Sequence, residues 1–360
     1  MTSTPVAPPT APTPGPPVTP DEPGPPAAPR SRGPLGTVMV WGGGVVAVVL
    51  IATGAVQATG WFAVQRETRT ETFAAADRLV VRGSGDVEVV VDPAATATSV
   101  QVSDRWGLNR PTFESTEGTD GTLELRSTCP DTSVLWIADG VCASDLVVTV
   151  TPDTVVDLST TSGHVTAGDL TGDVAAHSDY GDVRVRATGG AVHATTSSGH
   201  VTVSDAGGAV LARSSYGDVE VTAAVGAVQA GTDSGHVRVT DVDGDVVATS
   251  QYGDVTVTAV RGHASAVTSS GFATVSDVTG DAEARSEYGD VSVQGAGGDV
   301  VARTASGHAT VVAGPDDAPV ALTIRTASGR TTVEAPTDPS ARRTVEIASE
   351  YGDVAYRLAR

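Results

Sequence analysis

The sequence predicts an all-β protein whose main part is a parallel β-solenoid, a stack of coils built from short strands. Two observations lead to this prediction. A glycine stands at every ninth position from Gly163 to Gly307, and valine or alanine follows two and four residues after each one. Alternation with a period of two is typical of strands, and glycine marks a turn where φ can be positive. We therefore expect each nonapeptide to form one strand and one corner.

Two nonapeptides make one coil of eighteen residues. Parallel coils of this kind stack at about 4.8 Å, the spacing of hydrogen-bonded strands. Strands that follow SGH or YGD corners carry mostly Val-x-Val, whereas the opposite strands carry alanine at the second site. Large side chains facing small ones predict a thin core with no internal ligand cavity.

A third inward-facing column of the coil is hydroxylic. We expect its side chains to donate to the next coil and to accept from the previous one, which would satisfy buried hydroxyls. The column comprises Thr160, Ser178, Thr196, Ser214, Thr232, Ser250, Thr268, Ser286, Thr304, Thr326 and Ser349.

One corner of the coil alternates between SGH and YGD. Carboxylates repeated every ~4.8 Å would repel one another, whereas carboxylates alternating with imidazoles attract or hydrogen-bond. The residues after the glycine therefore predict a structural ladder, in which only Phe272 departs from the pattern. The ladder consists of His164, Asp182, His200, Asp218, His236, Asp254, Asp290 and His308.

The residue before the same glycine alternates between serine and tyrosine, so that each ring has a small neighbour. Two coils separate successive tyrosines, which places the rings every ~9.6 Å along one edge. Rings that point outward would form a strip for a glycan or a protein partner, and rings that fold over the corner would shield the core. The sequence leaves both readings open. The candidate interaction strip is Tyr180, Tyr216, Tyr252 and Tyr288, and Tyr351 repeats the motif near the C-terminus.

The N-terminal part of the chain predicts a membrane anchor. A proline-rich stretch is expected to be a disordered tail, and the uncharged segment that follows it is long enough to cross a bilayer as one helix. Arg30 and Arg32 precede this segment, so the positive-inside rule places the tail in the cytoplasm and the rest of the chain outside. A cleaved signal peptide is the alternative.

These features divide the chain into five parts. We expect a Pro-rich cytoplasmic tail over 1–34, a transmembrane helix over 35–62, a juxtamembrane linker over 63–78, an irregular N-terminal β region over 79–158 and the repetitive solenoid over 159–360. The segments APTDPSARR and AYRLAR are candidates for the cap at the far end. Cys129 and Cys142 fall on the oxidising side of the membrane and are expected to form a disulfide within the N-terminal region.

The composition argues against several functions. A net charge of −21 repels nucleic acid. Calcium-binding nonapeptides have the same period, but the extra glycines of their motif are missing here, and Asp169, Asp205, Asp241 and Asp277 recur only on alternate coils. The evenly spaced ladder has no three-ligand cluster for zinc, and no catalytic motif interrupts the periodicity. We predict no catalytic, cofactor-binding or metal site.

The GSGDVEVVV start, the TPDTVVDLSTTSGHVTAGDLTGDV entry and the SGHVTV/YGDVEV units resemble the bacterial putative adhesin family over about residues 75–360. This family is a membrane-anchored β-helical domain of unknown function. The resemblance implies an envelope location and an adhesion role, and it supplies no catalytic residues.

The sequence therefore predicts a non-catalytic, single-pass cell-membrane protein whose solenoid is a structural or adhesin-like interaction module. Cell-wall glycans or surface proteins are the expected partners. The alternative is an envelope sensor or scaffold, in which the Pro-rich tail meets a cytoplasmic partner. A calcium-binding roll and a polysaccharide-active enzyme are less favoured classes.

Overall fold

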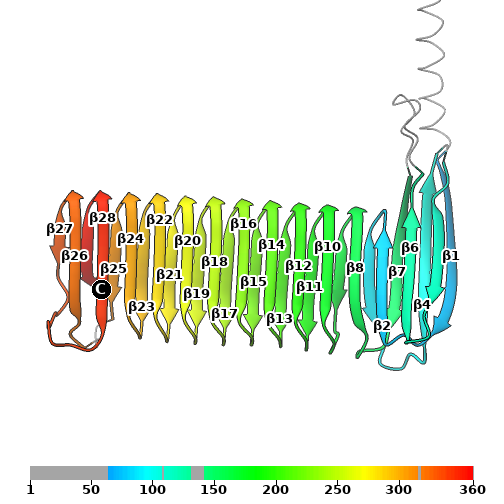
Figure 1. Cartoon of the computed structure of the whole chain (residues 1–360), viewed down its shortest axis with the longest axis horizontal. Coiled ribbons are helices and arrows are strands. Elements are labelled where there is room, and N and C mark those ends of the chain that lie inside the picture. The colour runs from blue at the N-terminus through cyan, green and yellow to red at the C-terminus, as the bar shows by residue number, and fades with distance from the viewer. Residues whose placement is uncertain (1–63, 108, 131–141, 315–317, 360) are drawn as a thin grey trace, which may run out of the picture. The chain divides into compact units, whose positions relative to one another are not determined.

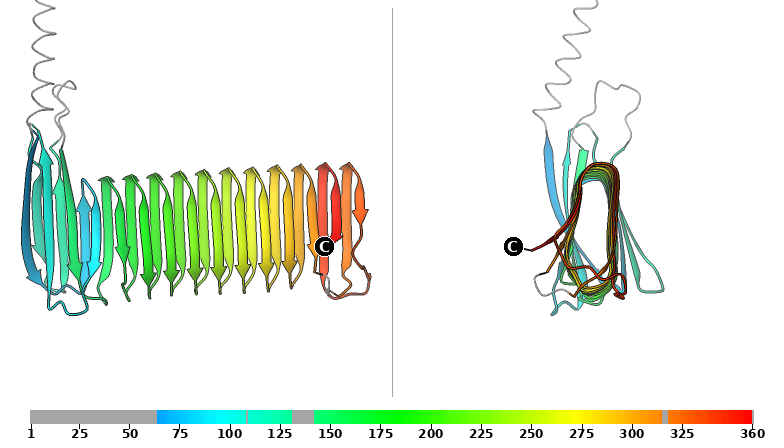
Figure 2. Two further views of the ribbon diagram at one scale, coloured as in Figure 1. Left: turned by 180° about the vertical axis from the view of Figure 1, so that it is seen from behind. Right: turned by 90° about the vertical axis from the view of Figure 1, so that its left-hand side faces the viewer.

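The structure, a computed structural model, describes residues 64–107, 109–130, 142–314 and 318–359. Every regular element among these residues is a β-strand, and the strands form a 15-stranded sheet and a 14-stranded sheet, here called sheet A and sheet B. From Cys142 onward successive strands alternate between the two sheets, so this part of the chain winds as a flat two-walled coil (Figures 1 and 2). The predicted β-solenoid is confirmed.

The repetitive part consists of nine coils in chain order. Their sheet B strands are β8 (Val155–Ser162), β10 (Val174–Tyr180), β12 (Val192–Ser198), β14 (Val210–Tyr216), β16 (Val228–Ser234), β18 (Val246–Tyr252), β20 (Ala264–Ser270), β22 (Ala282–Tyr288) and β24 (Val300–Ser306). Their sheet A strands are β9 (Val165–Gly168), β11 (Val183–Thr188), β13 (Val201–Ala206), β15 (Val219–Ala224), β17 (Val237–Val242), β19 (Val255–Val260), β21 (Ala273–Val278), β23 (Val291–Ala296) and β25 (Ala309–Ala313).

Neighbouring coils pair in parallel with a constant shift of eighteen residues, as in Val183 opposite Val201. Equivalent side chains therefore lie directly above one another. In β13, Val201 and Val203 are buried, and in β14 the buried pair is Val210 and Ala212. The large-against-small core predicted from the sequence is thus present.

The two corners of each coil differ in which residue adopts a positive φ. At the first corner, where the chain leaves sheet B, the glycine itself has positive φ, for example +154° at Gly181. At the second corner the positive φ falls three residues before the glycine, on Asp169, Ala187 and the residues equivalent to them. The expectation that every ninth glycine supplies positive φ therefore holds for one corner only. Gly190 is small for another reason: a Cβ there would lie 2.6 Å from the carbonyl carbon of Gly172 in the coil before.

The hydroxylic column is buried, but it does not bond along itself. Ser178 Oγ donates to the carbonyl oxygen of Gly163 at 2.8 Å, and Thr196 Oγ1 donates to that of Gly181 at 2.9 Å. The expected chain of hydroxyls is wrong because the carbonyl at the first corner of the previous coil is a nearer acceptor. The column thus links each strand to the neighbouring corner.

The N-terminal region begins with a strand, not with the expected linker. Its strands are β1 (Gln65–Ala74), β2 (Arg78–Gly83), β3 (Val87–Val91), β4 (Ala97–Trp106), β5 (Thr112–Glu117), β6 (Thr122–Thr128) and β7 (Cys142–Val150). The sequence does not show the apolar alternation of a strand in β1, because one of its partly buried residues is the charged Arg69. Arg69 pairs with the buried carboxylate of Asp104 at 2.7 Å and lies over the ring of Phe113.

Both ends of the solenoid contain a coil that lies out of chain order. At the N-terminal end, β2 lies between β6 and β8, and β3 lies between β7 and β9. At the C-terminal end, β28 (Thr344–Tyr351) and β29 (Val354–Leu358) lie between the coil of β24 and β25 and the coil of β26 (Ala321–Ser328) and β27 (Thr331–Val333). AYRLAR therefore belongs to the penultimate coil, and the outermost coil comes from residues before it.

The predicted tail and transmembrane helix, over 1–34 and 35–62, lie outside the described residues. Among the residues that the structure does describe, no helix is long and apolar enough to cross a membrane.

Candidate functional site

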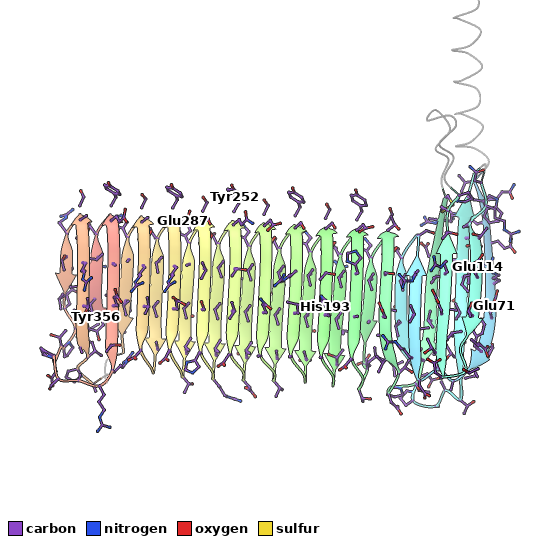
Figure 3. All side chains as sticks on the ribbon, viewed as in Figure 1. Glu71, Glu114, His193, Tyr252, Glu287 and Tyr356 are labelled. Carbon is purple, nitrogen blue, oxygen red and sulfur yellow. A yellow bond between two sulfur atoms is a disulfide. The ribbon has the colours of Figure 1, made fainter. Side chains whose placement is uncertain are left out.

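The first corner carries the tyrosines, and all of them are exposed. Tyr180, Tyr216, Tyr252, Tyr288 and Tyr351 are between 64% and 66% exposed, and Tyr252 projects from one long edge of the stack (Figure 3). The reading in which the rings fold over the core is therefore excluded. We call these five residues the tyrosine strip.

The rings of the strip are evenly spaced because their spacing follows the order of the coils in the stack and not the order of the residues in the chain. Ser198 lies between Tyr180 and Tyr216 in register, and a serine separates each later pair in the same way. At the C-terminal end the intercalated coil places Tyr351 next to Ser306 and Ser328. Tyr351 therefore lies two coils from Tyr288, like every other neighbour in the strip, although its sequence number suggests a larger distance.

The ladder beside the strip is held by backbone amides. The amide of Asp182 donates to Nδ1 of His164 at 3.0 Å, and the amide of His200 donates to Oδ1 of Asp182 at 2.9 Å. The same pattern continues along the stack through Asp218, His236, Asp254, Asp290, His308 and Asp353. Each side chain thus accepts a hydrogen bond from a backbone amide at the corner of the next coil.

This geometry fixes the histidine tautomer. An amide N–H can only donate, so Nδ1 of each ladder imidazole carries a lone pair, and the neutral ring holds its proton on Nε2. The imidazole–carboxylate contact is the longer one, with 3.7 Å between Nδ1 of His164 and Oδ2 of Asp182. The expected electrostatic alternation is therefore secondary to the hydrogen bonds with the main chain.

The corner presents several polar groups to solvent. The side chains of His164, His200 and His236 are more than half exposed, and each leaves Nε2–H free to donate. Oδ1 of the neighbouring aspartates accepts the amide, so Oδ2 remains to accept from a ligand. The edge therefore combines aromatic rings, hydroxyls, N–H donors and carboxylate acceptors in a fixed repeat.

Asp182 is the most enclosed carboxylate of the ladder. Burial on its own would raise its pKa, but the hydrogen bond from the His200 amide and the contact with the Arg184 guanidinium outweigh this effect, so the pKa lies below its ordinary value. Arg184 Nη2 lies 2.7 Å from Oδ2 of Asp182. An arginine therefore occupies the outward carboxylate oxygen of this coil, and Arg330 lies 3.8 Å from the equivalent oxygen of Asp353.

A second ladder at the opposite corner escaped the sequence reasoning. The amide of His263 donates to Oδ1 of Asp245 at 2.8 Å, and the amide of Asp281 donates to Nδ1 of His263 at 3.0 Å. Asp173 and Asp299 make the equivalent bonds with the coils that follow them. In the sequence, aspartate or histidine follows the second-corner glycine in most coils and indicates this ladder, but alanine follows it in three coils and interrupts the series.

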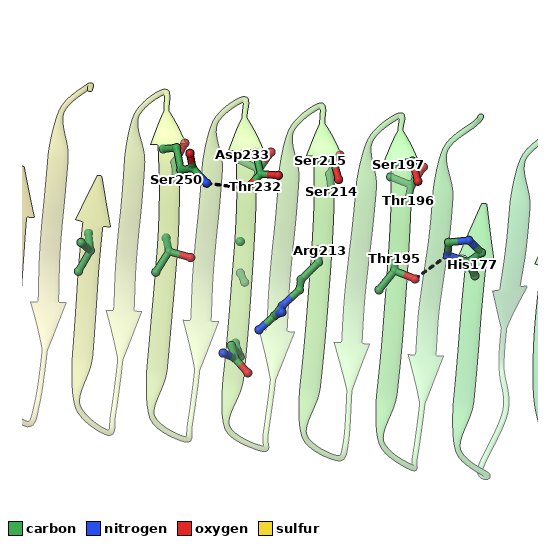
Figure 4. A pocket seen from close by; sticks show the side chains of 16 residues that line it. His177, Thr195, Thr196, Ser197, Arg213, Ser214, Ser215, Thr232, Asp233 and Ser250 are labelled. Carbon is green, nitrogen blue, oxygen red and sulfur yellow. Dashed lines mark hydrogen bonds between the residues drawn. The ribbon is translucent and has the colours of Figure 1, made fainter. Parts of the chain in front are cut away.

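The outer face of sheet B is hollowed next to the strip. The hollow has a volume of about 570 Å³. It is lined by outward side chains of β10 to β20, among them His177, Thr195, Arg213, Asp233, Thr249 and Gln251 (Figure 4). His177 Nδ1 is bonded to Thr195 Oγ1 at 2.9 Å, and Gln251 Nε2 donates to Oδ1 of Asp233 at 2.9 Å.

The remaining predicted features have structural positions. Cys129 and Cys142 form a disulfide with a Cα–Cα distance of 5.9 Å, which links the end of β6 to the start of β7. Asp169, Asp205, Asp241 and Asp277 occupy the positive-φ site of the second corner, a conformation that aspartate tolerates well. Among the described residues, no group of three or more histidines, cysteines and acids is placed to hold a metal ion.

Fold and edge together define a repetitive two-sheet β-solenoid domain with a periodic exposed surface. A family model described as Toastrack DUF4097 matches residues 208–359 of this chain. The resemblance stated from the sequence is thereby confirmed.

Solved structures that match this chain have low sequence identity to it and low TM-scores. A putative cell adhesion protein from Clostridium sporogenes is 9% identical, covers 82% of this chain and 100% of its own, and has a TM-score of 0.21. A putative adhesin from Bacteroides fragilis is 12% identical over 82% and 97%, with a TM-score of 0.21. A putative lipid binding protein from Parabacteroides distasonis is 10% identical over 82% and 97%, with a TM-score of 0.28. No curated protein matches the chain.

Proposed function

We propose that the solenoid is a non-catalytic binding module of the cell surface, and that its tyrosine strip binds an extended envelope glycan lying along the stack. In this proposal residues 35–62 anchor the chain in the cell membrane and the solenoid faces outward. The single observation that carries the binding role is the exposure of five tyrosines in register on one edge.

The spacing of the strip suits a polymer. Rings recur every second coil, at intervals of ~9.6 Å, which is close to the repeat of an extended disaccharide. Tyrosine offers an apolar face on which a sugar ring stacks and a hydroxyl for hydrogen bonding. Between the rings, the ladder histidines offer Nε2–H, and Asp218, Asp254 and Asp290 offer Oδ2, so the edge complements the mixed donors and acceptors of sugar hydroxyls.

The rigidity of the edge supports the same role. The amide-to-side-chain bonds hold each imidazole and carboxylate in one orientation, so little side-chain entropy is lost on binding. A regular array also provides many weak contacts at once, and linked contacts raise the overall affinity without one deep pocket.

The test compares the full chain in detergent with a variant in which Tyr180, Tyr216, Tyr252 and Tyr288 are changed to serine. Binding to purified cell-wall polysaccharide is measured by co-sedimentation and calorimetry. Val225→Ser, which removes an exposed apolar side chain at the second corner, is the control. We expect the tyrosine variant to lose binding with unchanged β-sheet circular dichroism, and the control to retain it. Equal binding by all three proteins would refute the proposal.

A further inference from the structure

A glycine opens the hollow on sheet B. Gly231 lies inside β16, opposite Arg213 of β14 and Thr249 of β18, on the outward face of the sheet. Its two neighbours in the row carry side chains and Gly231 does not, so the row has a gap at the place where the hollow lies (Figure 4).

The fold itself does not require glycine at this position. A Cβ on Gly231 would approach only Thr249, with 2.9 Å to its Oγ1 and 3.6 Å to its carbonyl oxygen, and a threonine hydroxyl can rotate away. The comparable Gly168 of sheet A is covered, because Cγ of Arg186 lies 2.9 Å from its Cβ position. Glycine inside a strand weakens a sheet and often marks a close approach by a ligand. Gly231 therefore leaves an uncovered space at a cost in stability.

The hollow also contains an arginine with a free guanidinium. Two other outward arginines of sheet B are paired, Arg285 with Glu283 and Arg303 with Glu346, whereas Arg78 and Arg325 lie outside the hollow and form no ion pair among the described residues. Among the described residues, no carboxylate lies within ion-pair distance of Arg213. Asp233 lines the hollow too, but its Oδ1 accepts from Gln251. A guanidinium presents a planar fork of donors that matches a carboxylate in a bidentate arrangement.

The hollow is continuous with the tyrosine strip. The residues on its rim, Ser215 and Gln251, directly precede Tyr216 and Tyr252. The lining continues from these rim residues along the strands to Arg213 and Gly231, and the Arg213 guanidinium points away from the strip (Figure 4), so a glycan stacked on the two rings reaches them by turning from the edge into the hollow.

We propose that this hollow binds a sugar acid, with the carboxylate on Arg213, the pyranose ring over Gly231 and the sugar hydroxyls on Thr195 and Thr249. The inference rests on the proposed function and specifies the glycan as one that carries uronic-acid units. A local arginine selects the acidic sugar at contact distance, and salt screens the negative charge of the remaining protein beyond about 8 Å.

The experiment uses two hexasaccharides that differ only in oxidation at C6, β-1,4-hexamannuronate and β-1,4-mannohexaose. Calorimetry with the full chain in detergent at 0.15 M salt gives both dissociation constants. We expect the acidic sugar to bind about tenfold more tightly, since a bidentate Arg–carboxylate contact is worth at least one decade. Arg213→Gln and Gly231→Thr are expected to abolish this preference, whereas the control Arg285→Gln retains it.

Gly231→Thr also separates binding from stability. Filling a strand with a β-branched residue should leave the melting temperature equal or higher, so a loss of preference in this variant cannot come from unfolding. A wild-type protein without preference, or a preference that survives Arg213→Gln, overturns the inference. Binding of both sugars by the variant with four tyrosines changed to serine would instead refute the proposed strip. Failure of the wild type to bind either sugar overturns both.

Discussion

The ladder at the first corner has one position without an acceptor. Phe272 replaces the histidine of its coil, and a phenyl ring cannot accept the amide of Asp290 in the next coil. Changing Phe272 to histidine should restore the bond, because four first-corner imidazoles accept the equivalent amide at 3.0 or 3.1 Å. A hydrogen bond of this kind contributes about 0.5–1.5 kcal/mol. Phe272 is 53% exposed, so the loss of its burial offsets only part of the gain.

We therefore expect Phe272→His to raise the free energy of unfolding by about 1 kcal/mol at pH 8. The assay is thermal unfolding followed by circular dichroism, combined with hydrogen exchange of the Asp290 amide, which reports the new bond locally. Phe272→Ala is the control, since it removes the ring without supplying an acceptor. The gain should disappear at pH 5, because a protonated imidazole has no lone pair on Nδ1. If the Asp290 amide exchanges equally fast in the histidine and alanine variants, the acceptor role assigned to the ladder is refuted.

Three further outcomes follow from single residues. The buried Thr188 hydroxyl is 3% exposed and lacks a partner among the described residues, so Thr188→Val should stabilise the chain by about 1 kcal/mol in denaturant unfolding. Asp182→Asn keeps the amide acceptor but removes the charge. Because the pKa of Asp182 is lowered on folding, its charge stabilises the protein above about pH 4, and the difference in melting temperature from wild type should vanish as the pH falls below that range. Gly217→Ala should destabilise by about 2 kcal/mol or more, since its φ is +146° and a Cβ would lie 2.0 Å from the carbonyl oxygen of Gly199.

Much of the fold could be predicted because every repeat places its strand, corner and core residues at the same positions. The position of Gly181 and the valines after it recurs so regularly that strand, corner and core follow from period alone. The same regularity located the tyrosines, whereas only the structure shows that their rings are exposed. A sequence repeat specifies which residues are equivalent, but not on which side of a corner a side chain emerges.

The errors fall where an interaction involves the main chain or breaks the repeat. The acceptors of Ser178 Oγ and of the Asp182 amide are a carbonyl and an imidazole one coil away, and no residue pattern distinguishes them from side-chain partners. The strand β1 was missed because its partly buried Arg69 reads as a solvent residue until the buried Asp104 is known. Gly231 passed unnoticed for a similar reason, since in the sequence it is one glycine among 41.

The order of the last coils follows from burial and from the ladder together. The coil of β28 and β29 carries Val345, Ile347 and Tyr356, all fully buried, whereas the coil of β26 and β27 carries Leu322 and Ile324, which remain partly buried. The more apolar coil gains more from having neighbours on both sides, so it occupies the inner place.

The ladder favours the same order. With Asp353 inside, its amide donates to Nδ1 of His308 at 3.0 Å, and its Oδ1 accepts the amide of Arg330 at 2.8 Å. In simple chain order Arg330 would lie next to His308, and no carboxylate would separate the two basic side chains. The insertion of the coil of β28 and β29 thus buries the more apolar side chains and also completes the hydrogen bonds of the ladder. Tyr351 belongs to the inserted coil, so this arrangement adds a fifth ring to the strip at the same spacing as the others. The coil order that completes the C-terminal end of the solenoid therefore also lengthens the proposed binding surface.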